Sequence, residues 1–232
     1  MEKQDQEFNI YAGNYREIHT QNVQAVSGQD SNFFTEYKIK EIASRNILAE
    51  DASWLDLGCG DGNSFRFIKK YFPGSSYQGI DVSEESVKIA RSNNDNADVF
   101  MAYDGKTIPF PDGTFDVVFI ACVMHHILPE NRANIISECR RVLKKGGKLI
   151  IFEHNPNNPV TMKLVNTCPF DDNAILLKCP ECKSVVKAGG FENVKSRFTI
   201  FLPRKGIFNK LLGIEKALTW LPLGGQYYVV AD

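Results

Sequence analysis

Apolar positions occur along the chain in short blocks, separated by segments with helical spacing. Strands are predicted for the apolar blocks at residues 52–57, 76–81, 98–103, 115–123 and 148–153. Helices are predicted between and before them, at residues 37–49, 63–72, 84–94 and 130–144. The block 115–123 lacks polar alternation, which is typical of a central parallel strand covered on both faces. Regular alternation of strand and helix predicts an α/β fold with a mostly parallel sheet.

The pattern changes after residue 154. The segment 154–172 has three prolines and four asparagines, which predicts a loop, and a loop of this length is usually functional. The remaining elements are expected to be a helix from Pro180 to Ala188, a strand at 193–201, a helix at 207–219 and a strand at 226–231. No repeat or second domain is recognisable, so residues 1–232 are expected to form one domain.

The segment from Trp54 to Asn63, WLDLGCGDGN, predicts a strand, a glycine-rich turn and the start of a helix. Its three glycines permit positive φ and a close approach of backbone to a ligand. A dinucleotide-binding fingerprint would have a glycine at position 63, but the chain has Asn63 there. Asp56 would also repel a phosphate and suits a cationic ligand, which disfavours a nicotinamide oxidoreductase.

The stretch WLDLGCGDGNS resembles motif I of the class I S-adenosylmethionine-dependent methyltransferases, type-11-like group. GIDVSEES at 79–86 is similar to the second motif of that family. Asp104-Gly105, together with residues 108–116, is similar to the loop before the fourth strand. RVLKKGGKLII at 141–151 is similar to the region of the fifth strand. The resemblance covers roughly residues 35–232. It implies a Rossmann-like, doubly wound sheet of seven strands with an antiparallel last strand. It also implies S-adenosyl-L-methionine as the cofactor.

The resemblance also implies the cofactor contacts. Asp56 is expected near the methionine amine, Asp81 at the ribose hydroxyls and Asp104 at the adenine amine. The full expected set is Tyr15, Lys38, Asp56, Gly58, Cys59, Gly60, Asp81, Val82, Asp104, Gly105, Ala121 and Cys122. The segment 1–36, rich in aromatic residues, is expected to be a lid over the cofactor. The structural alternatives are a turn that is only a connector, an Asp81 that only caps the next helix, and aromatic residues that only pack on the sheet.

Two histidines are candidates for the general base on the acceptor side. His125 follows the fourth predicted strand and His154 follows the fifth, where the catalytic groups of such sheets gather. The pKa of a histidine suits proton transfer at neutral pH. The alternative is that these side chains only satisfy local backbone groups. Polar residues of the segment 154–172 favour O-methylation of a sugar or related polar metabolite. A quinone-like or lipid-like acceptor, or a non-catalytic module that binds the cofactor or S-adenosylhomocysteine, stays an alternative.

The composition of the chain limits the kinds of binding partner that we expect. The formal net charge of −1 offers no broad attraction to nucleic acid, and no apolar run is long enough to cross a bilayer. We therefore expect a cytoplasmic protein with a small-molecule acceptor, with no nucleic acid or membrane partner, and the sequence gives no oligomeric state. The six cysteines should then be reduced. Cys179 and Cys182 form one C-x-x-C motif, which could belong to a zinc or redox site, but a second pair is lacking and no metal is expected.

Overall fold

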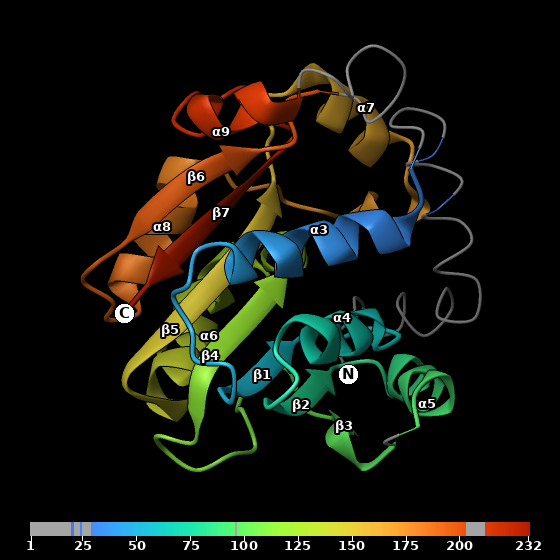
Figure 1. Cartoon of the computed structure of the whole chain (residues 1–232), viewed down its shortest axis with the longest axis vertical. Helices are drawn as coiled ribbons and strands as arrows, with labels where there is room; N and C mark the ends of the chain where they lie inside the picture. The colour runs from blue at the N-terminus through green and yellow to red at the C-terminus, as the bar shows by residue number, and fades with distance from the viewer. Residues whose placement is uncertain (1–19, 21–23, 25–28, 96, 203–211) are drawn as a thin grey trace.

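The computed structural model describes residues 20, 24, 29–95, 97–202 and 212–232. Its centre is a seven-stranded sheet with the strand order β3-β2-β1-β4-β5-β7-β6 (Figure 1). The strands are β1 Ser53–Leu57, β2 Ser76–Asp81, β3 Phe100–Ala102, β4 Phe115–Ala121, β5 Leu143–His154, β6 Lys195–Thr199 and β7 Gln226–Ala231. The first five pair in parallel, and β7 runs antiparallel to both β5 and β6. The predicted α/β class, with its antiparallel last strand, is confirmed.

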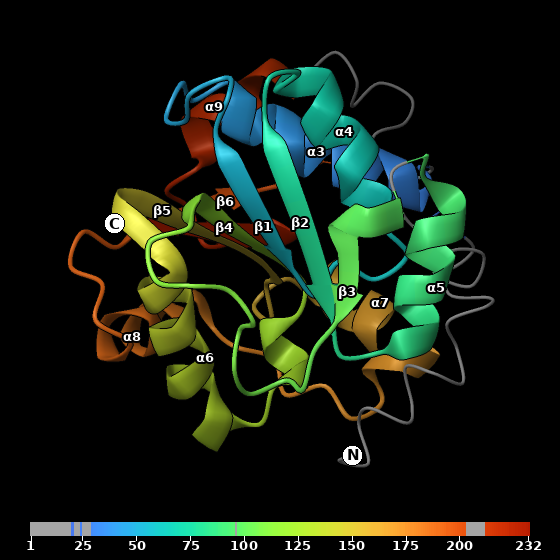
Figure 2. The same cartoon turned by 90° about the horizontal axis from the view of Figure 1, so that it is seen from below.

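Helices cover both faces of the sheet. The helices are α3 Ser31–Ala43, α4 Asn63–Tyr71, α5 Glu84–Asn93, α6 Pro129–Val142, α7 Pro159–Asn166, α8 Cys179–Ala188 and α9 Glu215–Leu218. Figure 2 shows α6 and α8 on one side of the sheet and α3 and α4 on the other. Each side has its own apolar core: Ile135 and Val186 belong to one cluster, and Ile39 and Ile68 to the other. Burial of both faces explains why the central strands are almost entirely apolar.

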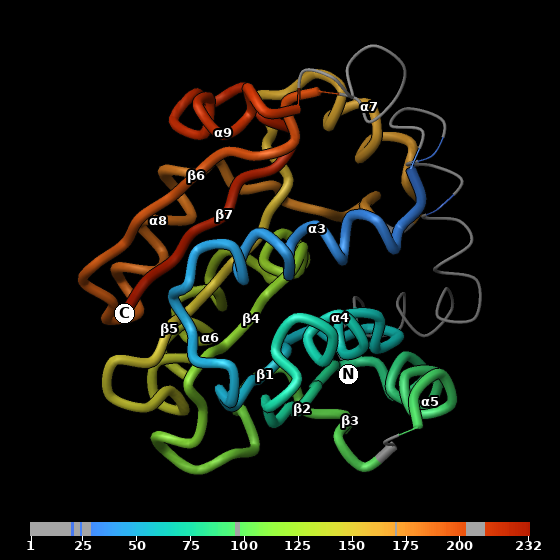
Figure 3. Tube along the Cα trace, in the orientation of Figure 1, coloured from blue at the N-terminus to red at the C-terminus, as the bar shows by residue number. Residues whose placement is uncertain are grey.

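The strand order reverses between β1 and β4, and their neighbours β2 and β5 run in the same direction. The carboxyl ends of these four strands therefore share one edge. In open α/β sheets this reversal point is where ligands bind. The tube of Figure 3 shows α3 crossing the sheet in front of β4.

Two of the predicted helices have a boundary that differs from the structure by more than one residue. The first helix spans 31–43 rather than 37–49, because Asp30 caps it by accepting a hydrogen bond from the Phe33 N–H at 2.9 Å. The helix predicted for 130–144 ends at Val142, before the glycine pair at 146–147. That pair lies inside β5, where the pairing with β4 shifts register.

The segment 154–172 is not the loop that was predicted. It contains α7 and a 3-10 turn at Pro169–Asp171. Asn158 caps α7 by accepting hydrogen bonds from Val160 and Thr161, and Pro159 occupies the first turn, where a missing N–H costs nothing. Of the helix predicted for 207–219, the structure describes only the later part, where α9 lies, since residues 203–211 are outside the described ranges.

Candidate functional site

The turn after β1 requires glycine for two different reasons. Gly58 and Gly60 have φ values of 76° and 54°, in the left-handed region. A Cβ at Gly58 would lie 2.4 Å from Cγ2 of Val123, so packing alone excludes a side chain there. A Cβ at Gly60 would meet no described protein atom within 4 Å. The turn is therefore open beside Gly60, on the side where a ligand could approach its backbone.

Asp81 ties the end of β2 to this turn. Its Oδ2 accepts a hydrogen bond from the Gly60 N–H at 2.9 Å, and its Oδ1 accepts one from the Ser83 N–H at 2.9 Å. Burial raises the pKa of Asp81, while backbone N–H groups that include Val82 oppose the rise. Each carboxylate oxygen has a further lone pair, so these bonds leave capacity for ligand hydroxyls.

Asp56 lies deeper, with only 1% of its surface exposed. Its Oδ2 accepts a hydrogen bond from the Tyr77 hydroxyl at 2.8 Å. Burial raises the pKa of Asp56 to about 7, which the hydrogen bond from Tyr77 opposes. Cys59 is likewise buried, so the apparent contribution of this residue to the site is its backbone.

Lys38 brings a positive charge to the same region from α3. The residue is 8% exposed, and no hydrogen bond or ion pair joins its ammonium group to any of the described residues. Its charge favours the ionised forms of Asp56 and Cys122, whose pKa values are raised mainly by burial. An ammonium group that no carboxylate of the described residues pairs with is available to an anionic ligand group. Tyr15, which also belongs to the expected cofactor-binding set, lies outside the described residues, as does most of the expected lid at 1–36.

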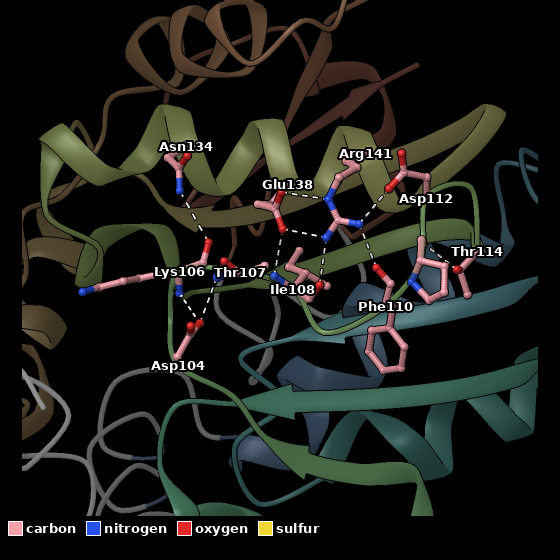
Figure 4. Close-up of polar contacts among 11 residues, drawn as sticks. Asp104, Lys106, Thr107, Ile108, Phe110, Asp112, Thr114, Asn134, Glu138 and Arg141 are labelled. Carbon is pink, nitrogen blue, oxygen red and sulfur yellow. Dashed lines mark hydrogen bonds and ion pairs between the residues drawn. The ribbon is translucent and has the colours of Figure 1, made fainter.

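The loop after β3 holds Asp104 and is fastened to α6 (Figure 4). Asp104 is exposed, and its Oδ1 accepts hydrogen bonds from the N–H groups of Lys106 and Thr107, both at 2.8 Å, which lower its pKa. Further along the loop, Arg141 of α6 donates to the carbonyl oxygens of Ile108 and Phe110 at 2.8 Å. The loop position is therefore set by a helix that sequence analysis did not connect with it.

Two residues of the expected cofactor-binding set are neighbours. A Cβ at Gly105 would lie 3.1 Å from Cγ1 of Val82, and the φ of Gly105 is 72°. The ends of β2 and β3 thus come together.

Cys122, directly after Ala121 at the end of β4, has a φ of 59°. Few residues other than glycine adopt this region, and such strain gathers at functional sites. The amide Nε2 of Gln226 donates to Cys122 Sγ at 3.7 Å, whereas Oε1 of Gln226 is buried without a hydrogen-bond partner among the described residues. Gln226 was not predicted as a site residue, because it comes from β7 at the far end of the sequence.

The histidines lie among carboxylates. His125 Nδ1 is 2.6 Å from Oε2 of the buried Glu153, and His125 Nε2 is 3.5 Å from Oδ1 of Asp171. Burial opposes protonation of His125, but the charge of Glu153 prevails and raises its pKa to about 10. Both ring nitrogens of the first candidate base therefore face carboxylates.

Two further histidines belong to this cluster. His126 Nε2 lies 3.6 Å from Asp171 Oδ1, and the ring centroid of His154 lies 5.3 Å from that of His125. Burial lowers the pKa of His126 to about 3 and that of His154 to about 4. His126 and Asp171 were not predicted as functional. The adjacent pair His125 and His126 was a signal for His126. Nothing in the sequence links that pair with Asp171, which lies more than forty positions later.

The C-x-x-C motif does not form the alternative site. Cys179 and Cys182 are both buried in α8, and burial raises the pKa of each thiol. A redox cysteine needs the opposite shift. No third potential ligand gathers with the pair in the described part of the chain, which disfavours a zinc site there.

A family model described as a methyltransferase domain matches residues 55–151, which include the turn, Asp81, Asp104 and β4. An uncharacterized protein from Methanocaldococcus jannaschii is 33% identical over 150 residues, 63% of this chain and 68% of that protein. A demethylmenaquinone methyltransferase from Thermotoga maritima is 34% identical over 104 residues, 45% of this chain and 44% of that enzyme. The chain thus matches less than half of the length of the Thermotoga enzyme.

The fold of the chain also resembles that of a solved structure. A crystal structure from Thermotoga maritima, described as a SAM-dependent methyltransferase and possible histamine N-methyltransferase, has a TM-score of 0.69 to this chain. The two are 17% identical, and the match covers 99% of each chain. No helix among the described residues is long and apolar enough to span a membrane.

Proposed function

Since the chain belongs to the S-adenosylmethionine-dependent methyltransferases, we propose that it transfers the methyl group of S-adenosyl-L-methionine to a small polar acceptor. Two oppositely charged side chains near the glycine turn support this proposal most directly. Asp81 is held by the Gly60 N–H, and Lys38 is buried without a partner among the described residues.

The two groups suit opposite ends of the cofactor. Asp81 would accept hydrogen bonds from the ribose hydroxyls, and Asp104 with Gly105 would lie at the adenine. The ammonium of Lys38 would bind the methionine carboxylate through a charge-assisted hydrogen bond. This orientation directs the sulfonium methyl group toward Cys122 and the histidines at the ends of β4 and β5.

The acceptor would approach from this histidine side. A methyl group leaves a sulfonium by direct displacement, so the acceptor atom must lie in line with the S–CH₃ bond. His125 and His154 stay the residues proposed for the acceptor side, together with Asp171. Because both ring nitrogens of His125 face carboxylates, its proposed part is to position Asp171 beside the acceptor.

A hydroxylated acceptor such as a sugar fits this polar side. Some of the polarity expected from the segment 154–172 is used internally, since Asn155 donates to the carbonyls of Pro222 and Gly224 and Asn158 caps α7. The case for O-methylation therefore depends on the histidine cluster. A second candidate is a quinone-like acceptor, since the Thermotoga relative is a demethylmenaquinone methyltransferase.

The proposal is tested by release of S-adenosylhomocysteine. The full chain is incubated with S-adenosylmethionine and with hydroxylated, amine and quinone acceptors in turn, and the product is measured by mass spectrometry. The proposal expects acceptor-dependent release, highest with a hydroxylated compound. Tight cofactor binding with no release from any acceptor class would instead support a non-catalytic binding module.

A further inference from the structure

Three side chains from two separate segments direct metal-ligand atoms at one point. His125 and His126 lie on the 3-10 turn Met124–His126 after β4, and Asp171 ends the 3-10 turn Pro169–Asp171. One ligand atom from each of the three lies within 4.8 Å of the others. No other group of this kind occurs in the described ranges of the chain.

The separations match those around a small ion. Asp171 Oδ1 is 3.5 Å from His125 Nε2 and 3.6 Å from His126 Nε2. Nitrogen and oxygen ligands at about 2.0–2.1 Å from a tetrahedral zinc ion are about 3.3–3.4 Å from one another. Two of the three separations are therefore close to ligation distance before any rearrangement.

The second nitrogen of His125 is already oriented. Its Nδ1 contacts Glu153 Oε2 at 2.6 Å, and Glu153 Oε1 accepts a hydrogen bond from the Met124 N–H at 2.8 Å. Glu153 is fully buried, so the contact is shielded from water. Histidines that bind metals usually donate from the other ring nitrogen to a carboxylate, a backbone carbonyl or water, because this fixes the ring and the tautomer.

The two segments are also fixed to each other. The Ile175 N–H donates to the His125 carbonyl at 2.8 Å, four residues after Asp171. Arg132 of α6 joins both sides, since it donates to the carbonyl of Ile127 at 2.9 Å and to that of Ile175 at 2.6 Å. The two segments that carry the three ligand atoms are thus held together by contacts that do not involve those atoms.

We infer that His125, His126 and Asp171 bind one divalent transition-metal ion, with zinc as the best-suited metal, and that Glu153 positions His125 for it. Two imidazoles and one carboxylate favour zinc or a neighbouring first-row ion over magnesium or calcium. Three protein ligands leave a fourth position open, as in catalytic rather than structural zinc sites.

The use of that open position rests on the proposed function. A hydroxyl oxygen of the acceptor bound to the ion would lose its proton to water more readily. The oxygen lone pair would then form the new C–O bond, and the electrons of the breaking S–CH₃ bond would stay on sulfur, giving S-adenosylhomocysteine. Neither oxidant nor reductant is needed.

The inference is tested without cofactor or acceptor. The full chain is stripped of metal with a chelator and titrated with Zn²⁺ by calorimetry and with Co²⁺ by visible spectroscopy. One ion should bind per chain, with the cobalt spectrum of a four-coordinate site that has nitrogen and oxygen ligands. Asp171→Asn and His126→Ala should each weaken binding by more than about 100-fold, and Glu153→Gln by about 10–100-fold. Asp172→Asn alters an exposed neighbouring carboxylate and should bind like the unaltered chain.

Circular dichroism and S-adenosylmethionine affinity of each variant show whether it has kept its fold. The inference is overturned if no saturable site is found, if Asp171→Asn binds as tightly as Asp172→Asn, or if Cys179→Ser removes the site. A chain that binds zinc at these residues but binds no S-adenosylmethionine would contradict the proposed function and leave the metal site in place.

Discussion

Asp81 accepts a hydrogen bond from the backbone N–H of Gly60 at 2.9 Å, although the two residues lie on different strand ends. This contact fixes the carboxylate beside the one glycine of the turn at which a Cβ would meet no described atom. The same turn needs glycine at position 58 for packing against Val123. The relationship between Asp81 and Gly60 therefore defines where a ligand can contact both backbone and carboxylate.

Replacement of Asp81 tests the ribose contact. Asp81→Ala should weaken S-adenosylmethionine binding by about 1.5–3 kcal/mol, the usual range for hydrogen bonds to a charged group. Calorimetric titration measures the change, and Glu84→Ala, which alters an exposed carboxylate of α5, is the control. Equal affinity of both variants for S-adenosylmethionine would show that Asp81 does not bind the ribose.

Lys38→Met tests the contact with the methionine carboxylate. The variant should bind S-adenosylmethionine about 10–150-fold more weakly, because a charge-assisted hydrogen bond is lost. Its free energy of unfolding should change little, since no hydrogen bond or ion pair with the described residues is lost. Lys40→Met changes an exposed residue of the same helix and should leave affinity unaltered. A large loss of stability without loss of affinity would show that Lys38 is structural.

Gly60→Val tests whether the open side of the turn is occupied by the cofactor. The variant should lose binding because its side chain enters that space, and it should lose about 1–2 kcal/mol of stability because of the positive φ. Gly113→Val is a matched control, since Gly113 has a φ of 65° and equally open surroundings in the loop before β4. It should show the loss of stability alone. Normal binding by Gly60→Val would mean that the turn is only a connector.

Asp56 should make the stability of the chain depend on pH. Burial raises its pKa to about 7, above its value in an unfolded chain, so the folded state holds the proton more tightly. The stability that protonated Asp56 contributes is fully present below about pH 4 and is lost as the pH rises through about 7. Asp56→Asn removes this loss. The free energy of unfolding of the variant, relative to that of the unaltered chain, should therefore increase by about 2–3 kcal/mol from pH 5 to pH 8.

Urea unfolding at several pH values measures that difference, and Asp51→Asn, at an exposed position just before β1, is the control. If the difference between Asp56→Asn and the unaltered chain is the same at pH 5 and pH 8, Asp56 does not retain its proton near neutral pH.

The sheet was predictable because its signals are local. The almost wholly apolar block at 115–123 and the glycine turn at 58–62 each identify their element without help from distant residues. The boundary of α3 was missed although its signal, Asp30 before the helix, is in the sequence. The α7 helix was missed in the same way, since Asn158 and Pro159 are a capping residue and a first-turn proline. The asparagines and prolines of the segment 154–172 were instead interpreted as signs of a loop.

The site was only partly predictable because its contacts join segments that are far apart. Nothing local connects His125 with Asp171 or Cys122 with Gln226. Histidine at a strand end suggested a general base, whereas the folded chain places both of its ring nitrogens opposite carboxylates. Side-chain chemistry was visible in the sequence, but the role of each side chain depends on partners that only the fold brings together.

The most direct test of the account is a crystal structure of the full chain with S-adenosylhomocysteine. We expect the ribose hydroxyls to lie on Asp81, the adenine beside Asp104 and Gly105, and the methionine carboxylate on Lys38. The sulfur should then face Cys122 and the histidines, with room for an acceptor between them. S-adenosylhomocysteine bound away from Asp81, or with its sulfur directed away from His125, would contradict it.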